Sequence, residues 1–244
     1  MIGRVPGRMR GGLAAILAHP DDESFGPAGA LALAHDAGRP TRLLLITRGE
    51  AGGPAGAAPE AIVRTREDEL RCAAGRIGLD EVTSLEGYRD GAVAEASFDD
   101  LVRDIAGWLE RRRPEAVITF GPHGITHHPD HIAVGNATRW AAQRLVGAGI
   151  APAFLYVIAP VFGPGHSRYD LSPEEQGATH RIDITDVAER KLAALECHAS
   201  QPDIAEPIAD LRAAIESRIP IYEGYHRVRP AVLPPHPVFD AALL

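Results

Sequence analysis

The sequence predicts an α/β protein whose Rossmann-like, mostly parallel sheet has helices on both faces. Short apolar segments alternate along the chain with segments of helical spacing, which is the pattern of a parallel sheet covered on both sides. The apolar segments are hydrophobic at nearly every position, as expected for strands that are buried on both faces. No internal repeat and no linker divides the chain, so we expect a single domain over residues 1–244.

Each expected element follows from its local pattern. The expected strands share a short apolar run between loop residues and cover residues 13–18, 42–47, 82–88, 116–120, 154–159 and 182–184. The expected helices share an apolar stripe and cover residues 26–37, 62–77, 185–199 and 205–218, with two more beginning near residues 97 and 129. Ser97-Phe98-Asp99-Asp100 is a capping-box pattern, and Pro129 suits the first position of a helix. Residues 161–177 are expected to be irregular, and residues 230–237 extended.

The composition excludes several classes of protein. Of the 244 residues, 45% are hydrophobic and 24% are charged, which is typical of a globular protein and not of a disordered or fibrous one. The net charge of −8 argues against nucleic acid or an anionic membrane as the main partner. No apolar stretch approaches the length of a membrane span, and the run at residues 11–18 meets charged residues at once, which disfavours a signal peptide. Cys72 and Cys197 cannot form a disulfide framework, so we expect a reduced, cytoplasmic protein.

Two short polar segments follow expected core strands, where an α/β sheet places its ligand site. The first is Ala18-His19-Pro20-Asp21-Asp22-Glu23, and the second is His127-His128-Pro129-Asp130-His131. Both concentrate imidazole and carboxylate groups, which are ligands suited to zinc. One His and one Asp of the first segment, with one His of the second, would leave an open position for water on a catalytic zinc. The spacing alone does not distinguish Asp21 from Asp22 as the ligand.

These paired motifs resemble those of the PIG-L/LmbE-like family of zinc-dependent N-deacetylases, which includes the deacetylases of mycothiol and bacillithiol synthesis. The resemblance covers roughly residues 12–201 and continues through residues 47–50, 66–70, 88–91 and 198–201. It implies a hydrolase that holds one Zn²⁺ per chain and removes an N-acetyl group from an N-acetylglucosamine-type substrate or a related small amide. No Gly-x-Ser-x-Gly motif for a nucleophilic serine accompanies it.

The resemblance also implies a role for each matching residue. His19, Asp22 and His131 match the zinc ligands of the family. Asp21 matches the general base that activates water, a task suited to a carboxylate beside a metal. His128 matches the histidine that supports the negative charge on the tetrahedral intermediate.

Four further residues bear on this assignment of roles. Asp130 is expected to orient one of the histidines through its second ring nitrogen. The resemblance implies that Arg66 contacts the substrate, although an ion pair with Glu69 or Asp90 explains an inward-facing arginine equally well. It likewise implies that Asp90 contacts sugar hydroxyl groups; the alternative is that Asp90 only forms an Asp-Gly turn with Gly91. Some members carry a tyrosine that assists the oxyanion where this chain has Thr126.

Several polar features keep two interpretations each. Lys191 and His198 share an inward helix stripe, either to cap carbonyl groups and join a core network or to contact substrate. His123 and His127 either line the substrate entrance or are exposed loop histidines. The Gly/Pro/Ala-rich loop at Gly49–Pro59 is either a lid or a plain surface loop.

Three alternatives to the deacetylase differ in chemistry. The first is an amidase that cleaves a larger amide conjugate. The second is a non-haem iron enzyme with a facial triad, although such a triad usually occupies a β-barrel. The third is a non-catalytic binding module, which the complete set of polar residues disfavours; the missing glycine-rich fingerprint also disfavours NAD. For the deacetylase we expect a small-molecule amino-sugar or amide substrate as the partner, and the sequence is compatible with a homo-oligomer.

Overall fold

A seven-stranded, mostly parallel sheet forms the centre of the protein, which is described by a computed structural model over residues 11–53, 56–161 and 169–229. The strands are β1 (Leu13–Leu17), β2 (Thr41–Leu45), β3 (Glu81–Ser84), β4 (Ala116–Thr119), β5 (Phe154–Ile158), β6 (His180–Asp183) and β7 (Tyr222–Arg229). Their order in the sheet is β3-β2-β1-β4-β5-β7-β6. Strands β1 to β5 are parallel, and β7 runs antiparallel to both of its neighbours.

Burial follows the position of each strand in this order. Every residue of β1, β4 and β5 is buried, which explains why these segments are apolar throughout. Strand β3 alternates between exposed and half-buried residues because it forms an edge of the sheet. The prediction of a mostly parallel sheet with a fully buried centre is therefore confirmed.

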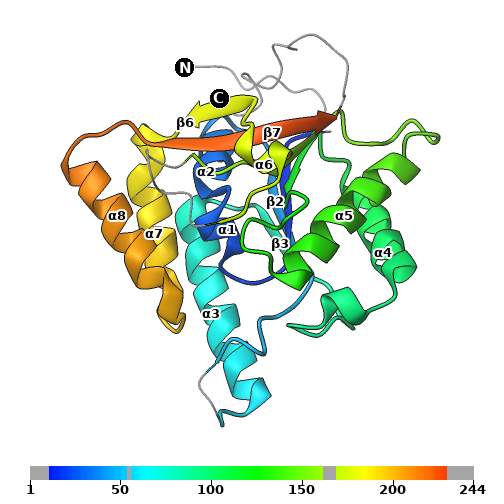
Figure 1. Ribbon diagram of the computed structural model, residues 1–244, viewed down its shortest axis with the longest axis horizontal. Coiled ribbons are helices and arrows are strands. Elements are labelled where there is room, and N and C mark those ends of the chain that lie inside the picture. The colour runs from blue at the N-terminus through cyan, green and yellow to red at the C-terminus, as the bar shows by residue number, and fades with distance from the viewer. Residues whose placement is uncertain (1–10, 54–55, 162–168, 230–244) are drawn as a thin grey trace.

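Helices cover both faces of the sheet (Figure 1). The helices are α1 (Asp22–Phe25), α2 (Ala28–Asp36), α3 (Pro59–Ile77), α4 (Phe98–Arg112), α5 (Pro129–Arg144), α6 (Pro173–Gln176), α7 (Ala188–Cys197) and α8 (Ala205–Glu216). The 3₁₀ turns are η1 (Val93–Glu95), η2 (Thr185–Val187) and η3 (Pro202–Ile204). Helices α4 and α5 pack together, while α7 packs against α2, α3 and α8 on the other side. Over the described residues, none of the helices has the length and apolar character needed to cross a membrane.

The strand order places a switch point between β1 and β4. The chain builds β1, β2 and β3 outward in one direction and then crosses through α4 to place β4 on the other side of β1. At such a point the connections after the two strands diverge to opposite faces and leave a crevice at the carboxyl ends. The two polar segments follow β1 and β4, so the topology brings them to this crevice.

The structure differs from the expected elements in several places; for example, the strand expected over residues 82–88 is β3, which ends at Ser84. The helix expected over residues 26–37 is α2, which begins at Ala28, and the short helix α1, which was not expected, precedes it with Gly26 and Pro27 between the two. Strand β7 was not expected because its sequence, YEGYHRVR, is rich in polar and charged residues. Irregular structure was expected over residues 161–177, yet the short helix α6 lies there; residues 162–168 and 230–237 lie outside the described part of the chain.

The two cysteines form a disulfide, so the prediction that they are reduced was wrong. Cys72 of α3 and Cys197, the last residue of α7, are bonded, with their Cα atoms 5.8 Å apart and a sequence separation of 125. The packing of α3 against α7 brings them together, and no local sequence pattern carries that information. Disulfides are typical of oxidising compartments, so the cysteines do not support the predicted cytoplasmic location.

Candidate active site

The first polar segment turns sharply after β1 and is held by the side chain of Asp22. One carboxylate oxygen of Asp22, Oδ2, accepts hydrogen bonds from the backbone N–H groups of Ala18 (3.1 Å) and His19 (2.7 Å). These bonds close the turn and leave the other oxygen, Oδ1, free to face the second segment. His19 and Asp22 are both 8% exposed, so the turn presents buried polar groups at the end of the strand.

The second segment begins α5 and carries two of the expected histidines. His128 is the N-cap residue of this helix, and its Nδ1 accepts a hydrogen bond from the backbone N–H of Asp130 at 3.2 Å. Pro129 takes the first helical position, as predicted. His131 lies in the first turn, where its ring stacks on Phe120 with the ring centroids 4.0 Å apart. The helix start thus aims two imidazoles at the end of β1.

Three ligand atoms from the two segments converge. Nε2 of His131 lies 3.2 Å from Oδ1 of Asp22 and 3.2 Å from Nδ1 of His19. The distance from Nδ1 of His19 to Oδ2 of Asp22 is 3.6 Å. Two imidazole nitrogens and a carboxylate are a ligand set that zinc favours in catalytic sites. The residues expected to be metal ligands are therefore brought together.

The hydrogen bonds behind the two histidines favour the tautomers that a metal needs. Nε2 of His19 lies 3.1 Å from a carboxylate oxygen of both Asp90 and Asp130, so this nitrogen carries the proton and Nδ1 faces the cluster unprotonated when His19 is neutral. Nδ1 of His131 lies 3.0 Å from the carbonyl oxygen of Gly124, which leaves Nε2 as the ligand atom. Such outer contacts orient metal-binding histidines. The donor set thus fits a metal ion.

The charges of the cluster also favour a cation. Burial lowers the pKa of His19, but hydrogen bonds to Asp130 and Asp90 and the charge of Asp22 outweigh it and raise the pKa to about 10. Burial raises the pKa of Asp22, but the charges of His131 and His19 outweigh it and hold this pKa well below its usual range. The carboxylates around His19 therefore favour positive charge at this point, as a metal ion would supply. His128 belongs to the same group, because its ring nitrogen lies within 4.8 Å of ligand atoms of His19 and His131.

Asp130 and Asp90 tie the surrounding loops to His19. Asp130 is fully buried and accepts hydrogen bonds from the backbone N–H groups of Gly91 (2.8 Å) and Val93 (3.0 Å). Oδ2 of Asp90 accepts a hydrogen bond from the backbone of Ala51 at 2.8 Å. Both aspartates therefore act on the cluster through Nε2 of His19 in this structure.

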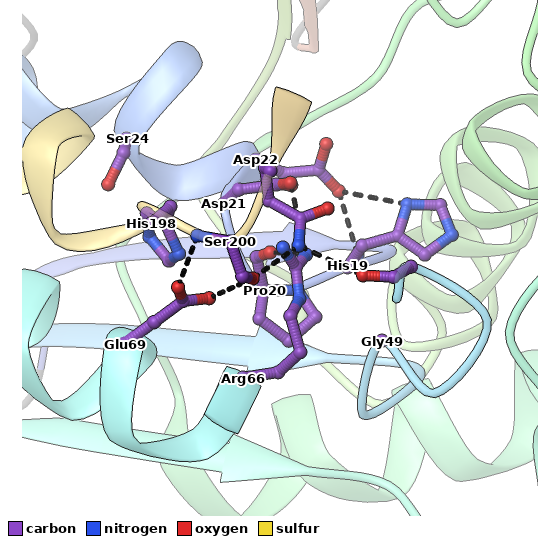
Figure 2. A network of polar contacts seen from close by, with 12 residues as sticks. His19, Pro20, Asp21, Asp22, Ser24, Gly49, Arg66, Glu69, His198 and Ser200 are labelled. Atoms are coloured by element: carbon purple, nitrogen blue, oxygen red, sulfur yellow. Dashed lines mark hydrogen bonds and ion pairs between the residues drawn. The ribbon is translucent and has the colours of Figure 1, made fainter. Parts of the chain in front are cut away.

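Asp21 lies beside the cluster in a strained conformation. Its φ angle is 129°, which a non-glycine residue rarely adopts. Its backbone N–H donates to Oε2 of Glu23 at 3.0 Å, and its Oδ2 accepts from Nη2 of Arg66 at 3.0 Å. Arg66, from α3, also donates to the carbonyl of Pro20 (Figure 2). Burial and the charge of Asp22 raise the pKa of Asp21 to about 7, although the charge of Arg66 opposes this.

A buried pair that the sequence analysis did not identify supports this turn. Nε2 of His198 lies 2.7 Å from Oε1 of Glu23, and both residues are fully buried. Oγ of Ser24 donates to the same oxygen at 2.7 Å. Burial lowers the pKa of His198, but the hydrogen bond and charge of Glu23 raise it overall. The interpretation of His198 as part of a core network is confirmed; the glutamate beside Asp22 in the first motif was the available signal for its partner.

A second unexpected contact joins α3 to the residues after α7. Glu69 accepts hydrogen bonds from the backbone N–H (2.7 Å) and the hydroxyl (2.9 Å) of Ser200 (Figure 2). Nε2 of Gln201 donates to the carbonyl of Gly52 at 3.0 Å. Glu69 is thus engaged by Ser200, and Arg66 pairs with Asp21 rather than with Glu69 or Asp90.

The remaining polar residues lie outside the cluster. Nζ of Lys191 donates to the carbonyls of Phe25 (3.1 Å) and Gly26 (2.6 Å), which confirms the prediction that it caps carbonyl groups. Thr126 is exposed. His123 and His127 lie together with Asp170, away from the three converging ligand atoms.

The fold and the site together define an α/β enzyme with a candidate metal centre at the switch point of its sheet. The family model for GlcNAc-PI de-N-acetylase (PIG-L) matches residues 14–142, which is more than half of the chain. The chain is also 31% identical to the probable N-acetyl-α-D-glucosaminyl L-malate deacetylase 2 of Bacillus anthracis, over 84% of this chain and 86% of that one. The chain belongs to the PIG-L family of N-deacetylases, which are amide hydrolases.

Solved structures share the fold. The N,N'-diacetylchitobiose deacetylase of Pyrococcus horikoshii is 22% identical with a TM-score of 0.68, and the match covers 88% of this chain and 83% of that one. The 4-carboxy-2-hydroxymuconate hydratase of Pseudomonas putida is 20% identical, also with a TM-score of 0.68, over 92% and 99% of the two chains. The same fold thus carries both amide hydrolysis and hydration, so the residues of the site decide the reaction.

Proposed function

We propose that this protein is a zinc-dependent hydrolase that removes an N-acetyl group from an N-acetylglucosamine-type substrate or a related small amide. The observation that carries the proposal is the convergence of His19, Asp22 and His131, with Asp21 directly before Asp22 in the same turn and in electrostatic contact with it. One Zn²⁺ per chain, held by those three residues, would polarise the amide carbonyl and lower the pKa of a water molecule. Membership of a deacetylase family supports the choice of an amide as the bond that is cleaved.

Asp21 is the proposed general base. Its carboxylate takes a proton from the attacking water and then delivers it to the departing amine nitrogen, so that acetate and a free amine remain. A base works best when its pKa lies near the working pH, and the pKa of Asp21 is raised to about 7. Arg66 fixes the carboxylate of Asp21 by its bond to Oδ2. The hydrogen bond from the backbone N–H of Asp21 to Glu23 holds the strained backbone conformation.

His128 is the proposed donor to the oxyanion. Because its Nδ1 accepts the hydrogen bond from the backbone of Asp130, a neutral ring carries its proton on Nε2. Burial and the charges of His19 and His131 lower the pKa of His128, which favours this neutral form. A neutral Nε2–H can donate to the oxygen that becomes negative as water adds to the carbonyl.

The substrate is proposed to be a small amino-sugar conjugate. A net charge of −8 disfavours nucleic acid or an anionic membrane. Asp90 is the proposed contact to the sugar; Arg66, which is 2% exposed and bound to Asp21, acts through the base, and Asp130 positions His19. The relative from Bacillus anthracis, named for a sugar–malate conjugate, supports a substrate of this class. The cytoplasmic location remains a prediction.

The experiment measures release of free amine from a panel of N-acetylglucosamine derivatives. We expect activity to disappear after chelation, to return with zinc, and to fall by about 10² or more in Asp21→Asn, which keeps the size of the side chain but removes the base. Asp68→Asn, an exposed aspartate of α3, is the matched control. Activity that survives in Asp21→Asn would contradict the role of the base. If the protein binds zinc but releases no amine from any derivative, the proposed substrate would change from an acetylated sugar to a larger amide conjugate.

A further inference from the structure

A second cluster of metal-binding side chains lies outside the site described above. It consists of His123 and His127, from the loop between β4 and α5, and Asp170, from the segment before α6. One ligand atom from each of these residues lies within 4.8 Å of the others. The proposed deacetylation uses none of the three.

Both imidazoles point at the same residue. Nδ1 of His123 lies 2.8 Å from the carbonyl oxygen of Asp170, and Nε2 of His127 lies 2.7 Å from that same oxygen. The carboxylate oxygen Oδ2 of Asp170 lies 3.8 Å from Nε2 of His127. Two imidazole nitrogens and a carboxylate oxygen therefore lie around the carbonyl oxygen of Asp170, and these donor atoms define the candidate site. The side chains of His127 and Asp170 are 45% and 84% exposed, so an ion can reach it from solvent.

A buried glutamate holds both halves of the cluster in place. Glu175 is fully buried, and its carboxylate accepts hydrogen bonds from the backbone N–H groups of His123 (3.3 Å) and Ile125 (2.9 Å). The same carboxylate accepts from the backbone N–H of Ser172 at 2.9 Å, two residues after Asp170. The loop and the segment before α6 thus share one anchor, which reduces the ordering cost that a ligand would otherwise meet.

We propose that His123, His127 and Asp170 form a second site for a divalent metal ion at the surface of the protein, and that the ion bound there is Zn²⁺. Imidazole nitrogens with one carboxylate suit zinc and similar ions, whereas magnesium and calcium prefer oxygen ligands. A neutral imidazole exposes the required lone pair by changing tautomer, so the ion replaces the two hydrogen bonds to Asp170. Because this site is exposed to solvent, whereas the three ligands of the buried cluster are not, it binds zinc more weakly than the buried cluster.

The test is a zinc titration of the metal-free protein by calorimetry. Wild type is expected to bind two ions, the second more weakly than the first. His127→Gly is expected to lose the second ion or bind it at least tenfold more weakly, and glycine suits the φ of 60° at this position. Asp170→Asn provides a second variant that leaves the backbone of the loop unchanged.

His35→Gln is the matched control. His35 is similarly exposed, at 42%, and its Nδ1 also lies 3.8 Å from an aspartate oxygen, that of Asp80. Because His35 has only one such aspartate beside it and, among the described residues, no second histidine in a cluster with it, the substitution His35→Gln is expected to leave both zinc-binding events unchanged. In wild type the second equivalent of zinc should raise the melting temperature, and in His127→Gly it should not. A single bound ion in wild type, or a second ion that persists in both variants, would overturn the proposal.

Discussion

Asp21 shows how single contacts control the chemistry of this site. Its φ of 129° is held by the bond from its backbone to Glu23, and its carboxylate is held by Arg66. Strain of this kind persists only where surrounding contacts impose it, and it is characteristic of functional positions. Arg66 is 2% exposed, so its charge acts on Asp21 with little screening by solvent.

The pH dependence of the reaction tests this contact. The base works only when deprotonated, so the rate rises as the pH increases through the pKa of Asp21. Arg66 lowers that pKa, and its removal in Arg66→Met raises it. The acid limb of kcat/KM against pH is therefore expected to move upward, by about one unit or more. Arg71→Met, an exposed arginine on the same helix, should leave the limb in place, and an unmoved limb in Arg66→Met would refute the interaction.

At the scale of single elements, the loop between β4 and α5 positions the side chain of His131. Its Gly124 has a φ of +60°, and its carbonyl oxygen accepts the bond from Nδ1 of His131. A Cβ atom at this glycine would lie 2.6 Å from the Cβ atom of His131. The loop and the helix therefore fit only when this position carries no side chain.

Gly124→Ala should weaken zinc binding at the buried cluster. The added methyl group displaces His131, and loss of an orienting contact typically costs about 10–100-fold in metal affinity. Gly149→Ala separates this effect from backbone strain, because Gly149 has a similar φ of +67° and no atom within 4 Å of an added Cβ. Zinc affinity equal to wild type in Gly124→Ala, measured by competition with a chelator, would contradict this role.

At the scale of the whole molecule, α3 and α7 form one unit around the site. The disulfide between Cys72 and Cys197 joins them, and Glu69 binds Ser200 just beyond the end of α7. The helix that supplies Arg66 is thus fixed to the segment that supplies His198. Arg66 therefore contacts Asp21 directly, and His198 supports it through Glu23, so two distant segments of the chain fix this turn.

Reduction of the disulfide should lower the melting temperature. The bond closes a loop with a sequence separation of 125 residues, and such cross-links stabilise proteins by about 2–4 kcal/mol, chiefly through the unfolded chain. The double variant Cys72→Ser/Cys197→Ser should melt lower than wild type and should not respond to reductant. A thiol titration of the unfolded, unreduced wild type should find no free cysteine. Two free thiols in that titration would contradict the bond.

Prediction from sequence worked where information is local. The helix over α4 was expected from a Ser97 cap and an apolar stripe, and Ser97 does accept the backbone bond from Asp100 at 3.3 Å. The same reasoning placed His19 and His131 after core strands, since a strand and the residues that follow it are read from a short window. It failed for β7, whose polar sequence forms a strand only because β5 and β6 lie on either side.

By itself, the sequence determined the alternation of buried strands and helices, because the spacing of apolar residues directly reflects which face is covered. It also determined the two polar segments and the kinds of ligand that they offer. Only the tertiary structure decided that Arg66 binds Asp21, that His198 binds Glu23 and that Cys72 joins Cys197. These partners are far apart in the chain. Their pairing depends on how the helices pack across the sheet, which no local window of the sequence contains.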